Sequence, residues 1–229
     1  MPSRSLALSR DLIARAHATP VADDATAQLF FTDDELAPGL KRVIAERVEA
    51  DTALWVFGYG SLIWKPEFEV AERRIGTVHG WHRRFCLLQR RFRGSPERPG
   101  LVLALEPGGT CAGVAFRLPA GEPHAALMPV WRREMRGKGY EARWVEVETA
   151  DGPITALTFV ANHDNDRYTG RLDESSIADI IAAGCGHLGP SAEYLFRTVE
   201  ACAELDIDDP HLWALDALVA ERLEACQRR

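Results

Sequence analysis

The spacing of apolar residues changes at Leu54, and this change limits the possible folds more than any other feature of the sequence. Before it, Leu40, Val43, Ile44 and Val48 recur at helical spacing. After it, short apolar runs separated by turn residues are typical of strands. The strand candidates are 54–58, 74–79, 81–90, 101–106, 111–118, 142–149 and 153–161. This series predicts a curved, largely antiparallel sheet or a barrel, in which the EPGG sequence at 106–109 makes a tight connection between two strands.

Helical patterns precede the strands. Residues 1–53 predict a mostly helical extension, and its FTDDEL sequence places Thr32 as a helix N-cap with Glu35 at the capping-box position. Pro38 and Gly39 are expected to interrupt or kink that helix. Three arginines among serines near the N-terminus loosely resemble a transit peptide, but a short surface helix fits them as well and is favoured; they are Arg4, Arg10 and Arg15.

Helical patterns also interrupt and follow the strands. One helix is predicted at about 122–136, and the last third of the chain contains three more. Their expected N-caps are Asp173, Ser191 and Asp209, the last followed by proline at the favoured first position. We therefore expect a single α+β domain over residues 54–229, preceded by the helical extension 1–53.

Composition excludes several classes of protein. The 229 residues are 46% hydrophobic, enough for one substantial core. A net charge of −7 argues against a nucleic-acid partner, and no apolar run approaches the roughly 20 residues that span a membrane. The five cysteines include no CxxC pair, which favours reduced thiols in a cytoplasmic protein. No interface stripe is evident, so a monomer is expected.

A glycine-rich turn, WVFGYGSLIW at 55–64, follows the first strand candidate. It is not a dinucleotide fingerprint, because Ile63 occupies the place of the third glycine, and it lacks the lysine of a P-loop. It also lacks the spacing of a hydrolase nucleophile elbow. Two readings stay open: the amides of Gly60, Ser61 and Leu62 converge on an anion, or the turn is only a bend between core segments.

One carboxylate stands out on the predicted helix at 122–136. Positions i, i+3, i+4 and i+7 of one helix face are taken by Leu127, Val130, Trp131 and Glu134. A carboxylate on a buried stripe is suited to acid–base work, because burial disfavours its charged form. The alternative is a structural ion pair between Glu134 and a nearby arginine. The neighbouring side chains of Arg132, Arg133 and Arg136 are expected to point elsewhere.

The most basic stretch is residues 73–98, with eight arginines and one acid. It either attracts an anionic ligand or forms a solvated face balanced by acidic neighbours. The HDND sequence at 163–166 reads as a polar loop, because it lacks full calcium-loop spacing. No metal site is expected, and no Ser/His/Asp or Cys/His set is readable.

Several motifs together carry a resemblance to a known family. VFGYGSLIW, GW-x-RRF, REM-x-GxGY and S-x-EYLF occur in this order between about Trp55 and Leu223. The combination resembles ChaC-type glutathione-specific gamma-glutamylcyclotransferases. The resemblance implies an α+β fold, a small and mostly antiparallel β-barrel surrounded by helices. The N-terminal 50 residues match more loosely.

The resemblance also implies an activity. Such enzymes cyclise the γ-glutamyl group of reduced glutathione, releasing 5-oxoproline and cysteinylglycine, and need no metal or cofactor. It assigns Glu134 as the catalytic base and Tyr194 as a substrate contact. The implied substrate loop consists of Val56, Phe57, Gly58, Tyr59, Gly60, Ser61 and Leu62. Two alternatives stay open: a cyclotransferase for other γ-glutamyl peptides or amines, and a non-enzymatic γ-glutamyl-binding module.

Overall fold

The computed structural model describes residues 5–17, 31–47 and 53–228. Contacts between residues divide the chain into two compact units, which we call the helical unit and the barrel unit. Among the described residues, the helical unit comprises 5–17, 84–103 and 167–228, and the barrel unit comprises 31–47, 53–83 and 104–166.

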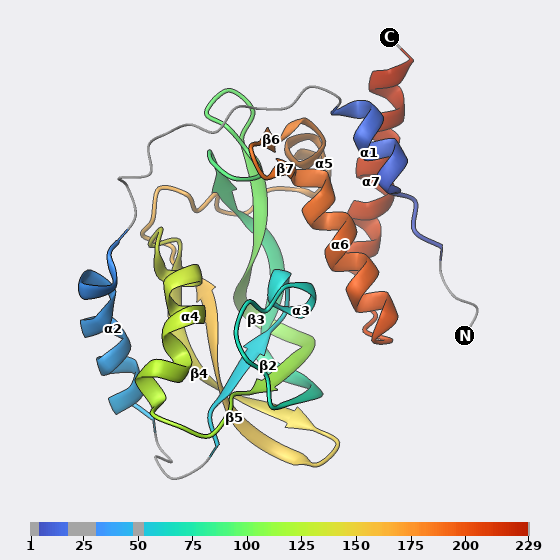
Figure 1. The fold of residues 1–229 in the computed structure, drawn as a ribbon. Coiled ribbons are helices and arrows are strands. Elements are labelled where there is room, and N and C mark those ends of the chain that lie inside the picture. Colours follow the sequence, from blue (N-terminus) through green and yellow to red (C-terminus); the bar gives the residue numbers. More distant parts are fainter. Residues whose placement is uncertain (1–4, 18–30, 48–52, 229) are drawn as a thin grey trace. The chain divides into compact units, whose positions relative to one another are not determined.

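The barrel consists of five strands that close on themselves (Figure 1). They are β1 (Trp55–Gly58), β2 (Glu72–Gln89), β3 (Gly100–Arg117), β4 (Tyr140–Thr149) and β5 (Gly152–Ala161). The order around the barrel is β1-β3-β2-β4-β5, with further pairing of β3 and β5. The pairs β1–β3, β2–β4 and β4–β5 are antiparallel, whereas β5 runs parallel to β1 and β3. The predicted small, mostly antiparallel barrel is therefore confirmed, and its closure removes free strand edges.

Two of the predicted strand boundaries are wrong. The candidates 74–79 and 81–90 form one strand, β2, and the EPGG sequence lies within β3 instead of connecting two strands. Glycines with positive φ lie at these points, Gly80 at 79° and Gly108 at 97°. Irregular glycine positions bend and twist a strand without ending it. These glycines, which the sequence pattern placed in turns, therefore lie at bends within two long strands.

Helix α2 (Asp33–Ala45) begins at the predicted capping box. The Thr32 hydroxyl accepts from the Glu35 amide at 3.4 Å, and the Glu35 carboxylate accepts from the Thr32 amide at 2.7 Å. The helix runs on through Pro38, so the expected interruption does not occur. Val48, predicted to continue this pattern, lies outside the described residues.

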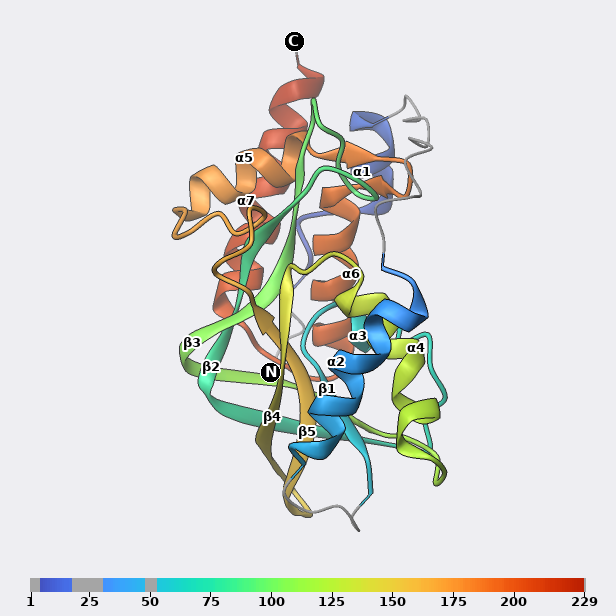
Figure 2. The ribbon, with the colours of Figure 1, turned by 90° about the vertical axis from the view of Figure 1, so that its left-hand side faces the viewer.

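Packing against helix α4 (Pro123–Met135) accounts for the continuity of α2. Figure 2 shows the two helices side by side. The Trp131 indole donates to the Leu36 carbonyl at 3.1 Å. A Cβ on Gly39 would lie 3.1 Å from the indole ring, so glycine there allows the close approach. Tertiary packing of this kind outweighs the helix-breaking tendency of Pro38.

The helical unit contains α1 and the C-terminal third of the chain. Its elements are α1 (Arg10–Ala16), α5 (Glu174–Ala183), β6 (Cys185–Gly186), β7 (Gly189–Pro190), α6 (Ser191–Glu204) and α7 (Pro210–Gln227). The predicted N-caps Asp173 and Asp209 are confirmed. Ser191 is not a cap: Pro190 precedes the helix, and the Ser191 hydroxyl bonds the amide and carbonyl of Leu101 at 3.1 and 3.0 Å.

The N-terminal 53 residues contribute one described helix to each unit, α1 and α2. The short helix predicted near the N-terminus corresponds to α1, although its Leu12 and Ile13 side chains are buried. Arg4 lies outside the described residues. The predicted division into an extension, 1–53, and a domain, 54–229, stays a prediction.

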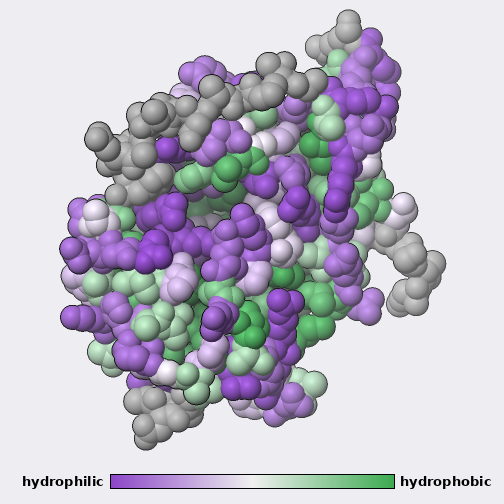
Figure 3. All heavy atoms as spheres, viewed as in Figure 1, coloured by the Kyte–Doolittle hydropathy of each residue, from purple (hydrophilic) through white to green (hydrophobic). Residues whose placement is uncertain are grey.

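The surface is mixed in polarity. On the face drawn in Figure 3, hydrophilic and hydrophobic side chains are interspersed. Two large hydrophobic side chains of the described residues are well exposed, Ile75 at 50% and Leu188 at 55%. Single exposed apolar residues are normal on protein surfaces. Among the helices described, none combines the length and apolar composition needed to cross a membrane.

A buried carboxylate on α7 fixes the segment before α1. Asp216 is 2% exposed and accepts from the amides of Ala7 and Leu8 at 2.6 and 3.3 Å. In Figure 1, α1 lies alongside α7. We expect Asp216→Ala to lower the free energy of unfolding by about 1–3 kcal/mol, because two amides lose their acceptor. Urea denaturation measures this loss, and the exposed Asp208→Ala serves as control. Equal stabilities of the two variants would contradict the prediction.

Glycine is required at the end of β1 because neighbouring atoms leave no room for a side chain. A Cβ on Gly58 would lie 2.8 Å from Leu62 Cβ and 2.9 Å from the Phe116 ring. We therefore expect Gly58→Ala to destabilise the protein by about 1–3 kcal/mol, since overpacking displaces its neighbours. Gly121→Ala is the control, because a Cβ there meets no atom within 4 Å. Thermal melting of both variants checks the prediction, which fails if Gly58→Ala melts as Gly121→Ala does.

Candidate active site

The glycine-rich turn leaves the barrel at the end of β1. Residues Tyr59 and Gly60 follow the strand, and the chain then makes one helical turn, α3 (Ser61–Trp64). The sequence predicted a loop here and missed this short helix. Gly60 is its N-cap residue. The first amides of a helix have no acceptor within it, so the Ser61 and Leu62 amides are suited to meet an anion.

The side chains of the predicted substrate loop lie mostly in the core. Val56 and Phe57 are completely buried, and Tyr59 and Leu62 are each 6% exposed. Ser61 is partly exposed. This segment therefore offers a ligand chiefly its main chain and the Ser61 hydroxyl.

Three side chains fasten the turn and β1 to the rest of the barrel. Arg83, 2% exposed, donates to the Tyr59 carbonyl at 2.9 Å and also to the carbonyl of Ala112. The Tyr59 hydroxyl donates to the Phe159 carbonyl at 2.5 Å. The Thr158 hydroxyl donates to the Phe57 carbonyl at 3.1 Å. Strands β2 and β5 thus contact the turn or β1 through these bonds, and β3 pairs directly with β1.

Glu134 lies in the last turn of α4, and its side chain is 12% exposed. Leu127, Val130 and Trp131, which the sequence placed on the same helix face, are all buried. The Glu134 carboxylate lies 3.0 Å from Nε of Arg133. The carboxylate is therefore largely withdrawn from solvent and also pairs with an arginine, and its role in acid–base chemistry stays a prediction.

Arg133 joins Glu134 to the turn, a contact that no pattern in the sequence predicts. Its Nη2 donates to the Ser61 hydroxyl at 2.7 Å. The expectation that Arg133 points elsewhere is wrong, because a long guanidinium side chain reaches around the helix from a neighbouring position. Arg132 does point elsewhere, toward Asp33. The guanidinium beside Asp33 lowers the pKa of that carboxyl.

Tyr194 belongs to the helical unit. It lies on α6, is 6% exposed, and its ring meets that of Phe85 edge-on at 6.0 Å. Its assignment as a substrate contact stays a prediction.

Several arginines of the basic stretch are engaged within their own unit. In the barrel unit, Arg74 pairs with Glu72 at 2.6 Å and lies over the Trp55 ring. In the helical unit, Arg93 pairs with Glu193 at 2.9 Å. These contacts favour the interpretation that the basic stretch is a solvated face balanced by acidic neighbours, over the interpretation that it attracts an anionic ligand.

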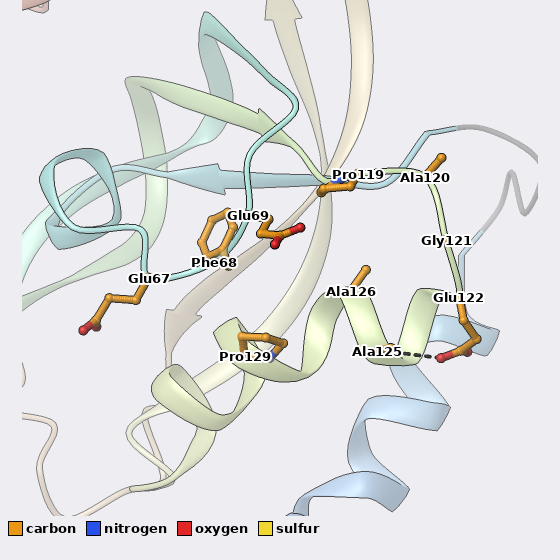
Figure 4. Close-up of a pocket in the computed structure, with 10 residues that line it drawn as sticks. All are labelled: Glu67, Phe68, Glu69, Pro119, Ala120, Gly121, Glu122, Ala125, Ala126 and Pro129. Atoms are coloured by element: carbon orange, nitrogen blue, oxygen red, sulfur yellow. Dashed lines mark hydrogen bonds between the residues drawn. The ribbon is translucent and has the colours of Figure 1, made fainter.

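A pocket of about 730 Å³ opens in the barrel unit beside α4 (Figure 4). The segment before β2 contributes Phe68 and Glu69 to its lining, and α4 contributes Ala126 and Pro129. Its walls are apolar apart from the carboxylates of Glu67, Glu69 and Glu122. Glu67 also pairs with Arg133 at 3.1 Å. Three carboxylates and no basic residue in the lining make this pocket unsuited to an anion.

No metal site is evident in the part of the chain that the structure describes, where no three His, Cys, Asp or Glu side chains gather suitably. His163 of the predicted polar loop contacts Glu106 at 2.7 Å. The cysteines are all free, with Cys226 exposed and the others buried.

Comparison with solved structures confirms the fold. The structure of a gamma-glutamyl cyclotransferase specific to glutathione from yeast superposes with a TM-score of 0.68 at 24% sequence identity. The match covers 75% of this chain and 97% of the yeast chain. The fold is therefore the gamma-glutamylcyclotransferase-like fold expected from the sequence.

Comparison with protein sequences identifies the family. The glutathione-specific gamma-glutamylcyclotransferase of Escherichia coli K12 is 34% identical over 206 residues, covering 90% of this chain and 89% of that protein. The glutathione-specific gamma-glutamylcyclotransferase 1 of Danio rerio is 37% identical over 179 residues, covering 74% of this chain and 90% of that protein. The family model of the ChaC-like proteins matches residues 54–222, which include the turn and Glu134. The chain therefore belongs to the ChaC-like family.

Proposed function

We propose that this protein is a glutathione-specific gamma-glutamylcyclotransferase, which cyclises the γ-glutamyl group of glutathione and releases 5-oxoproline and cysteinylglycine. Family membership and the names of the relatives support this activity. The observation that carries it is the link between the two candidate site elements: one arginine contacts both the Glu134 carboxylate and the Ser61 hydroxyl of the turn.

The proposed reaction is intramolecular. The α-amino nitrogen of the γ-glutamyl group attacks its own γ-carbonyl carbon, which closes a five-membered ring and breaks the bond to the cysteine nitrogen. Folding the substrate into this conformer supplies much of the rate enhancement, since effective molarities of well-oriented groups are very high. No nucleophilic Ser or Cys of the protein is required.

Proton transfer is the task that needs a side chain. At neutral pH the α-amino group is an ammonium and cannot attack until a base accepts a proton, which we assign to Glu134. The attacking nitrogen loses two protons over the reaction and the departing nitrogen gains two, so the sum needs no water and no net proton. A single carboxylate that accepts and returns protons in turn meets this need.

The turn is proposed to bind the anionic parts of the substrate. Main-chain amides at the start of α3 suit either the α-carboxylate or the oxyanion that develops on the γ-carbonyl oxygen. A single donor of this kind typically contributes about 3–4 kcal/mol to transition-state stabilisation. The buried contacts of Tyr59 and Arg83 hold these amides in a fixed geometry.

The pocket beside α4 is not assigned to the substrate. Glutathione carries two carboxylates and one ammonium at neutral pH, so its net charge is negative. The pocket presents Glu67, Glu69 and Glu122 and no basic lining residue. Like charges would oppose binding there, whereas the main-chain amides at the start of α3 favour an anion.

The five free cysteines support a reducing compartment, and we propose that the protein acts there, in the cytoplasm, as a monomer. The small-molecule substrate and the negative net charge support the absence of a nucleic-acid partner.

The activity is tested by incubating the purified protein with reduced glutathione and, in parallel, with γ-glutamyl-alanine. We expect equimolar 5-oxoproline and cysteinylglycine from glutathione and little reaction of the dipeptide, measured by liquid chromatography with mass detection. Preferential turnover of the dipeptide would reassign the protein to cyclotransferases of other γ-glutamyl compounds. Glutathione binding without turnover would indicate a non-enzymatic module.

Replacement of the proposed base tests its role. We expect Glu134→Gln to lower kcat by about 100-fold or more, because the amide cannot accept the ammonium proton. Glutathione binding, measured by calorimetry, should persist. Glu141→Gln is the matched control, because Glu141 is 43% exposed and pairs with Arg143 at 2.8 Å. Turnover by Glu134→Gln at the rate of the control would exclude Glu134 as the base.

A further inference from the structure

Arg133 makes more polar contacts than an ordinary surface arginine. Its Nε lies 3.0 Å from Glu134 Oε1, and its Nη2 donates to Ser61 Oγ at 2.7 Å. Its Nη1 lies 3.1 Å from Glu67 Oε2 and also donates to the Lys65 carbonyl. The side chain is 19% exposed. Every nitrogen of this guanidinium therefore has a contact, and three of the four partners lie on α3 or the residues directly after it.

The neighbouring Arg132 is an arginine that has no contact with the turn among those described. It forms a two-point ion pair with Asp33 on α2, at 2.7 and 2.5 Å, and its side chain is 46% exposed. Exposed pairs of this kind contribute little to stability and do not constrain a site. The chain thus provides a matched internal control one residue away.

The fork geometry of a guanidinium fixes the directions of its donors. With Nη2 on Ser61 and Nε on Glu134, the carboxylate is held in a set orientation relative to the turn. Arg133 also has a second acidic partner in Glu67, which Lys65 contacts at 3.1 Å. When Glu134 accepts a proton and becomes neutral, Glu67 still balances the charge of Arg133.

We propose that Arg133 is a positioning residue for the cyclisation. It aims the Glu134 carboxylate at the substrate held by the turn, places a positive charge beside that carboxylate, and retains its own charge balance through Glu67 during proton transfer. This inference rests on the proposed function, because it assigns a role within that reaction.

Kinetics of four variants test the proposal: Arg133→Met, Arg133→Lys, Glu67→Gln and the control Arg132→Met. We expect Arg133→Met to lower kcat by about 100-fold with a much smaller change in KM, because misplacing a catalytic group by about 1 Å has this effect. Arg133→Lys keeps the charge but loses the fork, so kcat should fall by roughly tenfold. Glu67→Gln should lower kcat less than Arg133→Met does. Arg132→Met should match the unmodified protein.

The pH profile separates positioning from a purely structural role. Removing a cation next to Glu134 makes its ionised form less favourable, so the carboxylate gains a proton at a higher pH. The acidic limb of the kcat profile should therefore move to higher pH in Arg133→Met. It should stay in place in Arg133→Lys and Arg132→Met, which keep the cation beside Glu134. Of the other charged groups here, Lys65 and Glu67 are unchanged in these three variants, and Arg136 donates to the Arg132 carbonyl.

Each outcome decides a different point. An unmodified protein without activity on glutathione would overturn the proposed function, and the inference with it. An active unmodified protein whose Arg133→Met variant keeps the kcat and pH profile of Arg132→Met would overturn the inference alone. If circular dichroism shows that Arg133→Met does not fold, Arg133→Lys decides. A lowered kcat at an unchanged Tm then supports the proposal, and an unchanged kcat overturns it.

Discussion

The closure of the barrel through β1 is the constraint on which the candidate site depends. This four-residue strand pairs antiparallel with β3 and parallel with β5, and all of its residues are buried. Little room remains at its end: a Cβ on Gly58 or on Gly113 of β3 would come within 3.0 Å of other atoms. The glycine-rich turn that follows is therefore placed by strand pairing and held by packing, so its amides have a fixed direction before any ligand arrives.

Two arginines, Arg83 and Arg133, connect the turn to other parts of the candidate site. Burying a guanidinium costs several kcal/mol unless its donors find acceptors, and both terminal nitrogens of Arg83 donate to carbonyls, one in the turn and one in β3. Arg133 then connects the turn to the last turn of α4, where Glu134 lies. An intramolecular reaction needs few protein groups. Amides that bind the anionic groups and one base are enough, provided that the fold holds them at fixed positions relative to one another.

Much of the fold could be predicted from local sequence signals. Three of the four predicted helix caps, at Thr32, Asp173 and Asp209, were confirmed, because a cap depends on residues close to it in the chain. The wrong predictions of helix and strand ends arose where tertiary packing outweighs the local conformational preference of proline or glycine. Pro38 did not interrupt α2, because Trp131 of α4 packs on that helix. The glycines at 108 and 109 bend one long strand instead of ending it, since barrel closure selects curvature over a turn.

By itself, the sequence determined the types of chemistry available: a glycine-rich turn, a carboxylate on an apolar helix face, and the order of motifs that marks the ChaC-like family. Only the tertiary structure decided how these parts meet. Arg133 and Ser61 are 72 positions apart, and no periodicity predicts their contact at 2.7 Å. The physical reason is that local patterns fix which face of an element a residue occupies, whereas contacts between distant elements depend on how the closed barrel and its helices pack.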